Sequence, residues 1–148
     1  MPIQKVFDFQ RKVIRGEITM KKNILVIDDL ADSRLILRIY LSKQGYSVIT
    51  AKDGVEALTM IAANKPALII SDIMMHKMGG VEFIETLKAK ILFGNIPVIL
   101  MSNKEKALVN PIAKDLMAYA FLEKPLDLAK LKRVVQSILS SLPSLSVA

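Results

Sequence analysis

The 148-residue chain contains no cysteine, no tryptophan and a single histidine. The lack of cysteine excludes a disulfide framework, a thiolate metal site and a cysteine nucleophile. Long apolar runs are missing too, because Gly, Pro or charged residues interrupt them before they reach the length needed to cross a bilayer. The first twenty residues also lack the small-residue cleavage site of a secretory signal. We therefore expect a cytoplasmic protein without a membrane partner.

Basic residues outnumber acidic ones, and the formal net charge is +7. Such a charge can indicate nucleic-acid binding. Here the positive residues are scattered along the chain, without a zinc-finger spacing or a basic-region run. A solvated basic surface is therefore favoured over a nucleic-acid partner. Hydrophobic residues make up 52% of the chain, which is enough for the closed core of one domain.

Short apolar runs rich in Val, Ile and Leu alternate with longer segments of helical spacing. This alternation is typical of strand–helix units around a parallel sheet. Right-handed crossovers place helices on both faces of such a sheet, which predicts a doubly wound α/β sandwich of three layers. The expected strands lie near 23–28, 46–50, 67–71, 97–102 and 119–122, and the expected helices lie near 32–44, 54–63, 80–90, 111–117 and 127–140.

Capping residues support several helix boundaries. Gly45 is expected to close the first helix, and Asp53 to open the second with a side chain that accepts a capping hydrogen bond. Asn110 and Pro111 predict the start of the fourth helix, because Asn caps well and Pro at the first helical position loses no hydrogen bond. That start leaves residues 103–109 as a long loop.

Residues 1–20 precede the repeating pattern as an N-terminal extension. Their apolar residues fit an amphipathic helix, but two short stretches would also fit a hairpin, so the periodicity leaves both structures open. The domain itself is expected over residues 21–141, with a short tail at 142–148. We expect no attached effector domain.

Charged and hydroxyl side chains follow four of the expected strands. Asp28 and Asp29 follow the first strand, Asp72 the third, Ser102 the fourth and Lys124 the fifth. Ligands of an open parallel sheet bind at the carboxyl ends of its strands, so we expect these side chains to converge. Three carboxylates in one crevice repel each other unless a cation compensates them. Mg²⁺, which prefers oxygen ligands, is the natural compensation.

Asp72 can act as a nucleophile, because a carboxylate can accept a phosphoryl group to form an acyl phosphate. The metal ion, Lys124 and Ser102 would neutralise and orient the oxygens of the transferred group. Taken singly, such residues are more often helix caps, surface lysines or loop starts. Their combination in this order predicts a phosphoryl-transfer site.

Five segments carry these residues: Ile24-Leu25-Val26-Ile27-Asp28-Asp29, Asp53-Gly54-Val55-Glu56-Ala57-Leu58, Ser71-Asp72-Ile73-Met74-Met75 with Gly80, Pro97-Val98-Ile99-Leu100-Met101-Ser102, and Phe121-Leu122-Glu123-Lys124-Pro125. In these segments and their spacing the chain resembles a stand-alone response-regulator receiver domain of two-component signalling, over roughly residues 22–141. The resemblance implies a flavodoxin-like sheet with the strand order 2-1-3-4-5.

The resemblance also implies a role for each site residue. Asp72 would be the phosphoacceptor, and Asp28, Asp29 and Asp72 would hold Mg²⁺ together with the backbone carbonyl of Met74. Ser102 and Lys124 would contact the phosphoryl group and relay its presence. Phe121 matches the aromatic residue whose rotamer reports activation, although an ordinary core phenylalanine fits this position equally well.

A few positions depart from the family pattern without removing a reacting group. Asn103 follows the hydroxyl residue where a small residue is usual, and Met117 stands where a glycine usually ends the fourth helix. Met74 and Lys104 each lie two residues beyond a site residue, where they would hinder the water that hydrolyses an acyl phosphate. We therefore expect slow self-dephosphorylation.

The first helix of the receiver region suggests a docking surface. Leu37 and Leu41 are expected to pack on the sheet with Ile36 and Tyr40 beside them, which leaves Leu35 and Ile39 pointing outward. In receivers this helix resembles the docking site of a sensor histidine kinase or a histidine phosphotransfer protein. The N-terminal extension or a second copy could cover it instead. Output would pass to an unnamed protein target or through a homodimer formed by the fourth and fifth helices.

Two other functions compete with a phosphorylated receiver. The first is a receiver-like interaction domain that works without phosphorylation. The second is a phosphatase of the haloacid dehalogenase type, which would share the nucleophilic aspartate, the hydroxyl and the lysine. Such enzymes need a second acid two residues after the nucleophile, and here that residue is Met74. We therefore expect a signalling domain whose phosphoryl chemistry is limited to its own aspartate, and no separate enzyme activity.

Overall fold

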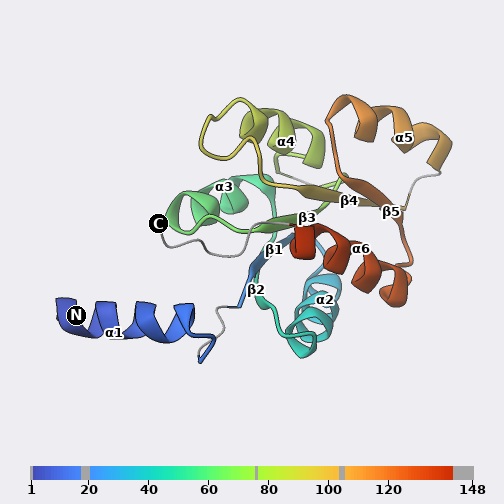
Figure 1. Ribbon diagram of the computed structural model, residues 1–148. Coiled ribbons are helices and arrows are strands. Elements are labelled where there is room, and N and C mark those ends of the chain that lie inside the picture. Colours follow the sequence, from blue (N-terminus) through green and yellow to red (C-terminus); the bar gives the residue numbers. More distant parts are fainter. Residues whose placement is uncertain (1, 18–20, 76, 104–105, 142–148) are drawn as a thin grey trace.

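The computed structural model describes residues 2–17, 21–75, 77–103 and 106–141. A parallel sheet in the order β2-β1-β3-β4-β5 forms its centre, as Figure 1 shows. The strand order and all five strands agree with the sequence-based prediction, and each boundary lies within one residue of it. The strands are β1 (Asn23–Ile27), β2 (Ser47–Ala51), β3 (Leu68–Asp72), β4 (Val98–Ser102) and β5 (Ala120–Glu123).

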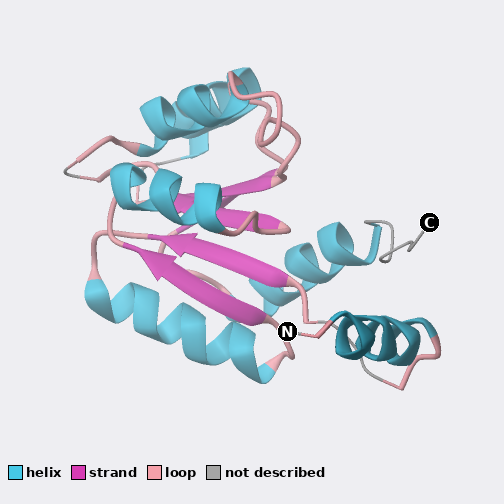
Figure 2. Cartoon of the chain, turned by 90° about the vertical axis from the view of Figure 1, so that its left-hand side faces the viewer, coloured by secondary structure: helices cyan, strands magenta, loops and turns pink. Residues whose placement is uncertain are grey.

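Helices cover both faces of the sheet and make the predicted three layers (Figure 2). Alternate residues of β1 belong to opposite cores, because successive strand side chains point to opposite faces. Ile24 and Val26 pack beneath α2 and α6, whereas Leu25 and Ile27 pack beneath α3, α4 and α5. The helices of these two layers are α2 (Ala31–Lys43), α3 (Gly54–Ala63), α4 (Gly80–Lys88), α5 (Lys106–Asp115) and α6 (Leu128–Ser141).

Two predicted helix boundaries are confirmed by their hydrogen bonds. Gly45 follows α2 with φ at 96°, a left-handed conformation that suits glycine, and its N–H donates to the carbonyl of Ser42 at 3.0 Å. The N–H of Tyr46 reaches back to the carbonyl of Leu41 at 3.3 Å, which completes a Schellman motif. Asp53 caps α3 by accepting a hydrogen bond from the N–H of Glu56 at 2.8 Å.

The predicted start of the fourth helix of the receiver region is wrong. Helix α5 begins at Lys106, so Pro111 lies inside it instead of opening it. A proline inside a helix costs about 3 kcal/mol, because it removes one hydrogen bond and crowds the preceding turn. The helical turn before Pro111 forms nevertheless, because it buries Val109 in the core on the same face as Ala113 and Leu116. Val109 is only 1% exposed. The predicted loop therefore shrinks, and Lys104 lies outside the described residues.

The end of α5 shows how the chain accommodates a residue that is not glycine. Met117 adopts φ at 53°, a conformation that L residues seldom take. The N–H of Met117 donates to Lys114 and that of Ala118 to Ala113, at 3.0 and 2.9 Å, so the helix end is closed by hydrogen bonds. The backbone geometry that favours glycine at a helix end is thus kept, although methionine occupies this position.

Helix α2 carries more apolar residues than its contact with the sheet requires. Leu37 and Leu41 are buried, and Leu35 and Ile39 are 46% and 47% exposed, as the sequence predicted. The expectation that Ile36 packs beside the buried pair is wrong, because this side chain is 55% exposed. A straight helix on a sheet buries a stripe of residues spaced four apart, and Ile36 lies one position off that stripe.

The N-terminal extension forms the helix α1 (Ile3–Ile14) and not the alternative hairpin. None of its residues is buried, and the helix projects away from the sheet in Figure 1. Within the described part of the chain, no helix combines the length and apolar composition needed to cross a membrane.

Candidate functional site

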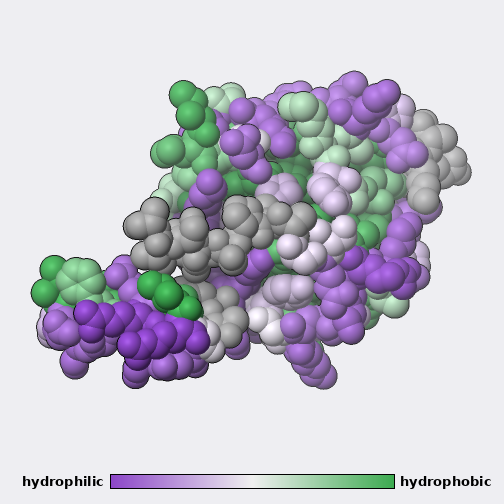
Figure 3. Space-filling view, viewed as in Figure 1, coloured by the Kyte–Doolittle hydropathy of each residue, from purple (hydrophilic) through white to green (hydrophobic). Residues whose placement is uncertain are grey.

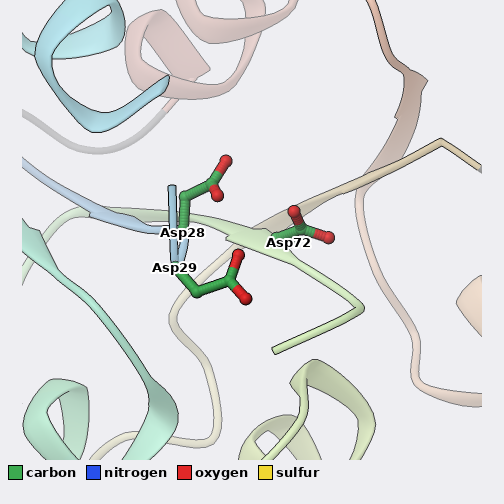
Figure 4. Close-up of side chains that lie close together, drawn as sticks. All are labelled: Asp28, Asp29 and Asp72. Carbon is green, nitrogen blue, oxygen red and sulfur yellow. The ribbon is translucent and has the colours of Figure 1, made fainter. Parts of the chain in front are cut away.

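Three carboxylates meet at the carboxyl edge of the sheet, as Figure 4 shows. Strands β1 and β3 are neighbours with Ile27 paired to Ser71, so the residues that follow in each strand, Asp28 and Asp72, are also neighbours. Asp29 is the next residue along the chain. One oxygen from each of these acids lies within 4.8 Å of the others, so the predicted convergence of the three aspartates is confirmed.

Lys124 joins two of these acids. Its Nζ lies 2.6 Å from Oδ2 of Asp28 and 2.7 Å from Oδ2 of Asp72. The side chain of Lys124 is 11% exposed, and those of Asp28 and Asp72 are 0% and 8% exposed. Two buried carboxylates therefore share one ammonium, which offsets their mutual repulsion.

The position of Lys124 also changes its own affinity for protons. Burial alone lowers the pKa of Lys124, because it disfavours the charged ammonium. The hydrogen bonds and negative charges of Asp28 and Asp72 act in the opposite direction and outweigh burial, so the pKa is raised above its ordinary value. Lys124 therefore stays charged throughout the physiological pH range.

Backbone amides hold the remaining oxygen of each paired acid. The N–H of Leu30 donates to Oδ1 of Asp28 at 3.0 Å, and the N–H of Met74 donates to Oδ1 of Asp72 at 3.0 Å. Each carboxylate is thus fixed by one backbone donor and by Lys124. A carboxylate held at both oxygens is oriented before a substrate arrives, which is how rigid sites favour reaction.

The other predicted site residues are Ser102 and Met74, which lie near the cluster, and Phe121, which lies further back along β5. Ser102 ends β4 at the same edge of the sheet and is fully buried, and its carbonyl accepts a hydrogen bond from the N–H of Lys124 at 2.8 Å. The peptide bond between Lys124 and Pro125 is cis. Met74 is 56% exposed beside Asp72. Phe121 is partly buried and packs against the core beneath α3, α4 and α5.

Sequence reasoning missed one side chain that supports the cluster. The guanidinium of Arg34 donates from Nη1 to the backbone carbonyl of Asp28 at 2.7 Å. This bond ties the first turn of α2 to the loop that carries the acid pair. The signal in the sequence is weak, because an arginine six residues after an acid is common on helix surfaces.

The role of Gly80 was also missed, although this residue was part of a matched segment. Its N–H donates to the carbonyl of Ile73 at 2.9 Å, so α4 starts directly against the end of β3. A Cβ atom at this position would lie 2.4 Å from the carbonyl oxygen of Asp72 and 2.8 Å from the Cα of Ile73. Only glycine permits this approach.

The donor chemistry of the cluster fits a hard divalent cation. All three acids offer carboxylate oxygens, and their spacing within 4.8 Å allows one ion to contact each of them. Asp29 is only partly buried, so the cluster opens toward solvent on its side. Mg²⁺, which keeps some of its water ligands, suits an open carboxylate site of this kind.

A family comparison identifies the fold and the class of function. The sequence model of the response regulator receiver domain matches residues 24–136. The chain belongs to this family. Members of the family are signalling domains of two-component systems, which argues against the haloacid dehalogenase alternative.

Curated relatives of this receiver domain are response regulators. It is 34% identical over 121 residues to the alkaline phosphatase synthesis transcriptional regulatory protein PhoP of Bacillus subtilis strain 168, across 81% of this chain and 49% of that protein. It is also 34% identical over 120 residues to the response regulator MprA of Mycobacterium tuberculosis strain ATCC 25177 / H37Ra, across 81% and 51%. The chain spans about half the length of the curated relatives it matches.

Solved structures support the same assignment. The chemotaxis protein CheY4 of Vibrio cholerae superposes on this receiver domain with a TM-score of 0.76 and 27% identity, over 80% of this chain and 99% of that one. A two-component response regulator from Clostridium difficile gives a TM-score of 0.77 and 26% identity, over 84% and 100%. The expected flavodoxin-like receiver fold is therefore confirmed.

Proposed function

We propose that this receiver accepts a phosphoryl group on Asp72 from a phosphohistidine donor, with Mg²⁺, and signals by changing its contacts with other proteins. The observation that carries the proposal is the shared ammonium of Lys124, which lies within 2.7 Å of both Asp28 and Asp72 in a cluster of three carboxylates. A site built only for stability would not gather three acids at one sheet edge with one lysine shared by two of them, because desolvated charges are costly.

The transfer reaction balances on the atoms of this site. An oxygen of Asp72 attacks the phosphorus of the donor, the new P–O bond forms as the P–N bond breaks, and the imidazole nitrogen keeps the electron pair. Oδ2 of Asp72 faces Lys124 and Oδ1 faces the N–H of Met74. These two donors reduce the repulsion between the carboxylate and the incoming anionic phosphoryl group.

Asp28, Asp29 and Asp72, together with the backbone carbonyl of Met74, would hold the metal ion. When bound, Mg²⁺ would supply positive charge to the oxygens of the transferred group. Lys124 would move its contact from Asp72 to a phosphoryl oxygen while its second partner, Asp28, keeps it in place. The chain itself therefore supplies the nucleophile, the cation and the metal ligands.

The phosphorylated state would be passed on from the same strand ends. The backbone hydrogen bond from the N–H of Lys124 to the carbonyl of Ser102 links β5 to β4, so a displacement of either residue would displace the other. In our proposal Ser102 contacts the phosphoryl group, and Phe121 at the other end of this short segment responds through its rotamer. Leu35 and Ile39 on α2 would receive the histidine kinase or phosphotransfer protein, and α5 and α6 would contact a target protein or a second copy. The proposed location is the cytoplasm.

A phosphodonor assay tests this function. The protein is incubated with Mg²⁺ and phosphoramidate or acetyl phosphate, and its intact mass is recorded. We expect the added mass of one phosphoryl group, lost when Mg²⁺ is chelated and absent in Asp72→Ala. A protein that gains no mass, or whose gain survives Asp72→Ala, would favour the phosphorylation-independent interaction domain instead.

A further inference from the structure

Helix α1 has one apolar face that is largely exposed in the described structure. Phe7 is 49% exposed, and Ile3 and Ile14, one and two turns away on the same side, are 72% and 63% exposed. Figure 3 shows hydrophobic atoms gathered along one side of the projecting helix and hydrophilic atoms along the other. The apolar face consists of Ile3, Val6, Phe7, Phe9, Val13 and Ile14. Burial of such a face is favourable, so an occupant is expected.

The charge of α1 indicates which occupant fits. The helix carries three cations, Lys5, Arg11 and Lys12, against one acid, Asp8. That acid already accepts a hydrogen bond from Gln4 at 3.1 Å. A short helix with phenylalanine on one face and Lys or Arg on the other is typical of segments that lie in the surface of an anionic membrane.

A second exposed apolar pair lies at the same edge of the domain. Ile91 and Leu92, in the turn before β4, are 97% and 73% exposed, and Lys88 and Lys90 precede them. Both this turn and α1 lead into the amino ends of strands, whereas the aspartate cluster lies at the carboxyl ends. In Figure 2 the arrowheads point away from the side on which α1 lies. The two apolar features therefore share the edge opposite the aspartates.

We propose that this edge binds the surface of an anionic bilayer, with the apolar face of α1 between the lipid headgroups. The cations of α1, Lys88 and Lys90 contribute electrostatic attraction to acidic lipids. Asp72 then faces away from the membrane and stays open to a protein donor. The sequence contains no segment long enough to span a bilayer and no secretory signal, but a helix that lies in the membrane surface needs neither.

A second copy of the chain fits α1 less well. At 12 residues the helix is shorter than two heptads, too little for a coiled-coil pair. The helix carries more positive than negative charge, so a second copy paired with it would bring like charges together. The exposed residues of α2 are not the occupant either, because Leu35 and Ile39 remain exposed in the presence of α1.

Vesicle binding by the full chain tests the proposal. The protein is mixed with vesicles of phosphatidylcholine alone, or of phosphatidylcholine and phosphatidylglycerol in equal amounts, and the bound fraction is measured by sedimentation. We expect binding to the anionic vesicles only, weakened by added salt. Each of Lys5→Gln and Lys12→Gln should reduce the partition constant about fivefold. Equal binding to both kinds of vesicle, or none to either, would overturn the proposal.

A pair of identical substitutions separates the apolar face from general surface effects. Val6→Gln removes a valine from the apolar face of α1, and Val55→Gln removes one from the surface of α3, where 53% of the side chain is exposed. We expect Val6→Gln to reduce vesicle binding severalfold and Val55→Gln to leave it unchanged. Both variants should unfold at the same temperature as the parent. Equal loss in both variants would contradict the proposal.

Because the chain contains no tryptophan, the fluorescence of an introduced tryptophan provides a second measurement. Phe7→Trp introduces a single tryptophan on the apolar face, and the emission of this tryptophan should shift to shorter wavelength with anionic vesicles. An unshifted emission would overturn the proposal. If the protein does not bind vesicles but forms a dimer, and Val6→Gln dissociates that dimer, the apolar face of α1 would instead bind a second copy of the chain. Neither measurement involves Asp72, so the result is independent of the proposed phosphorylation.

Discussion

The ammonium of Lys124 lies 2.7 Å from the carboxylate of Asp72, which places a positive charge against the proposed phosphoacceptor. The same nitrogen lies 2.6 Å from Asp28. One lysine therefore compensates two buried acids and presents a donor to any group that approaches Asp72. This double contact makes stability and, in our proposal, metal binding and phosphoryl transfer depend on the same side chain.

Lys124→Met should destabilise the protein and make its stability depend on Mg²⁺. The substitution leaves two largely buried carboxylates without their shared cation, and breaking such a pair costs about 3 kcal/mol. Mg²⁺ would restore part of this loss by compensating the acids. Chemical denaturation with and without Mg²⁺ measures both effects. Lys130→Met, at an exposed lysine on α6, is the control and should change little. Equal stability of the two variants without Mg²⁺ would contradict this account.

The contribution of Lys124 to stability should disappear only at high pH. Because the pKa of Lys124 is raised in the folded protein, its contribution is fully present below its unfolded value of about 10.4 and is lost as pH rises through the higher folded value. The difference in unfolding free energy between the parent and Lys124→Met should therefore be constant from neutral pH to about 10, then shrink. A difference that stays constant as the pH rises above about 10 would show that the pKa is not raised.

Adjacent glycines at the start of α4 should respond differently to alanine. Gly80→Ala would push a methyl group against the backbone of Asp72 and Ile73, which should cost about 1–3 kcal/mol and slow phosphorylation by displacing Asp72. Gly79→Ala meets only one atom, at an ordinary contact distance of 3.5 Å, and should be nearly neutral. Thermal unfolding and the rate of mass gain with phosphoramidate check both variants. Similar behaviour of the two would rule out the close approach at Gly80.

Met74 should lengthen the life of the phosphorylated state. Its side chain is 56% exposed two residues after Asp72, the last residue of β3, where it can hinder the approach of water. Met74→Asn should shorten the half-life of the acyl phosphate without changing thermal stability, because the side chain contributes little to the core. Combining it with Lys104→Glu should shorten the half-life further. An unchanged decay rate in the double variant would exclude this role.

The strands and the aspartate cluster could be predicted because they depend on local patterns. Apolar runs of four residues marked the buried strands, and parallel topology alone brings the carboxyl ends of these strands to one edge. Two local expectations failed where packing decided the outcome. Pro111 was read as a helix start, but burial of Val109 extends α5 by a turn. Ile36 was read as partly covered, but the contact of α2 with the sheet is too narrow.

Contacts between distant residues could not be predicted from the sequence. Nothing in the spacing shows that Lys124 lies against Asp28 and Asp72 at once, or that Arg34 holds the carbonyl of Asp28. The close approach of Gly80 to Asp72 likewise depends on how α4 meets β3. Such distances follow from tertiary packing, whereas the residue types that make them possible are visible in the sequence.

The central claim is that Asp72 accepts the phosphoryl group, and locating the phosphorylated residue tests it most directly. After incubation with phosphoramidate and Mg²⁺, borohydride reduces an aspartyl phosphate to homoserine, and peptide mass spectrometry locates that residue. The account predicts homoserine at position 72 and unmodified aspartate at positions 28 and 29. Reduction at Asp28 or Asp29, or no reduced residue in a protein incubated under these conditions, would contradict it.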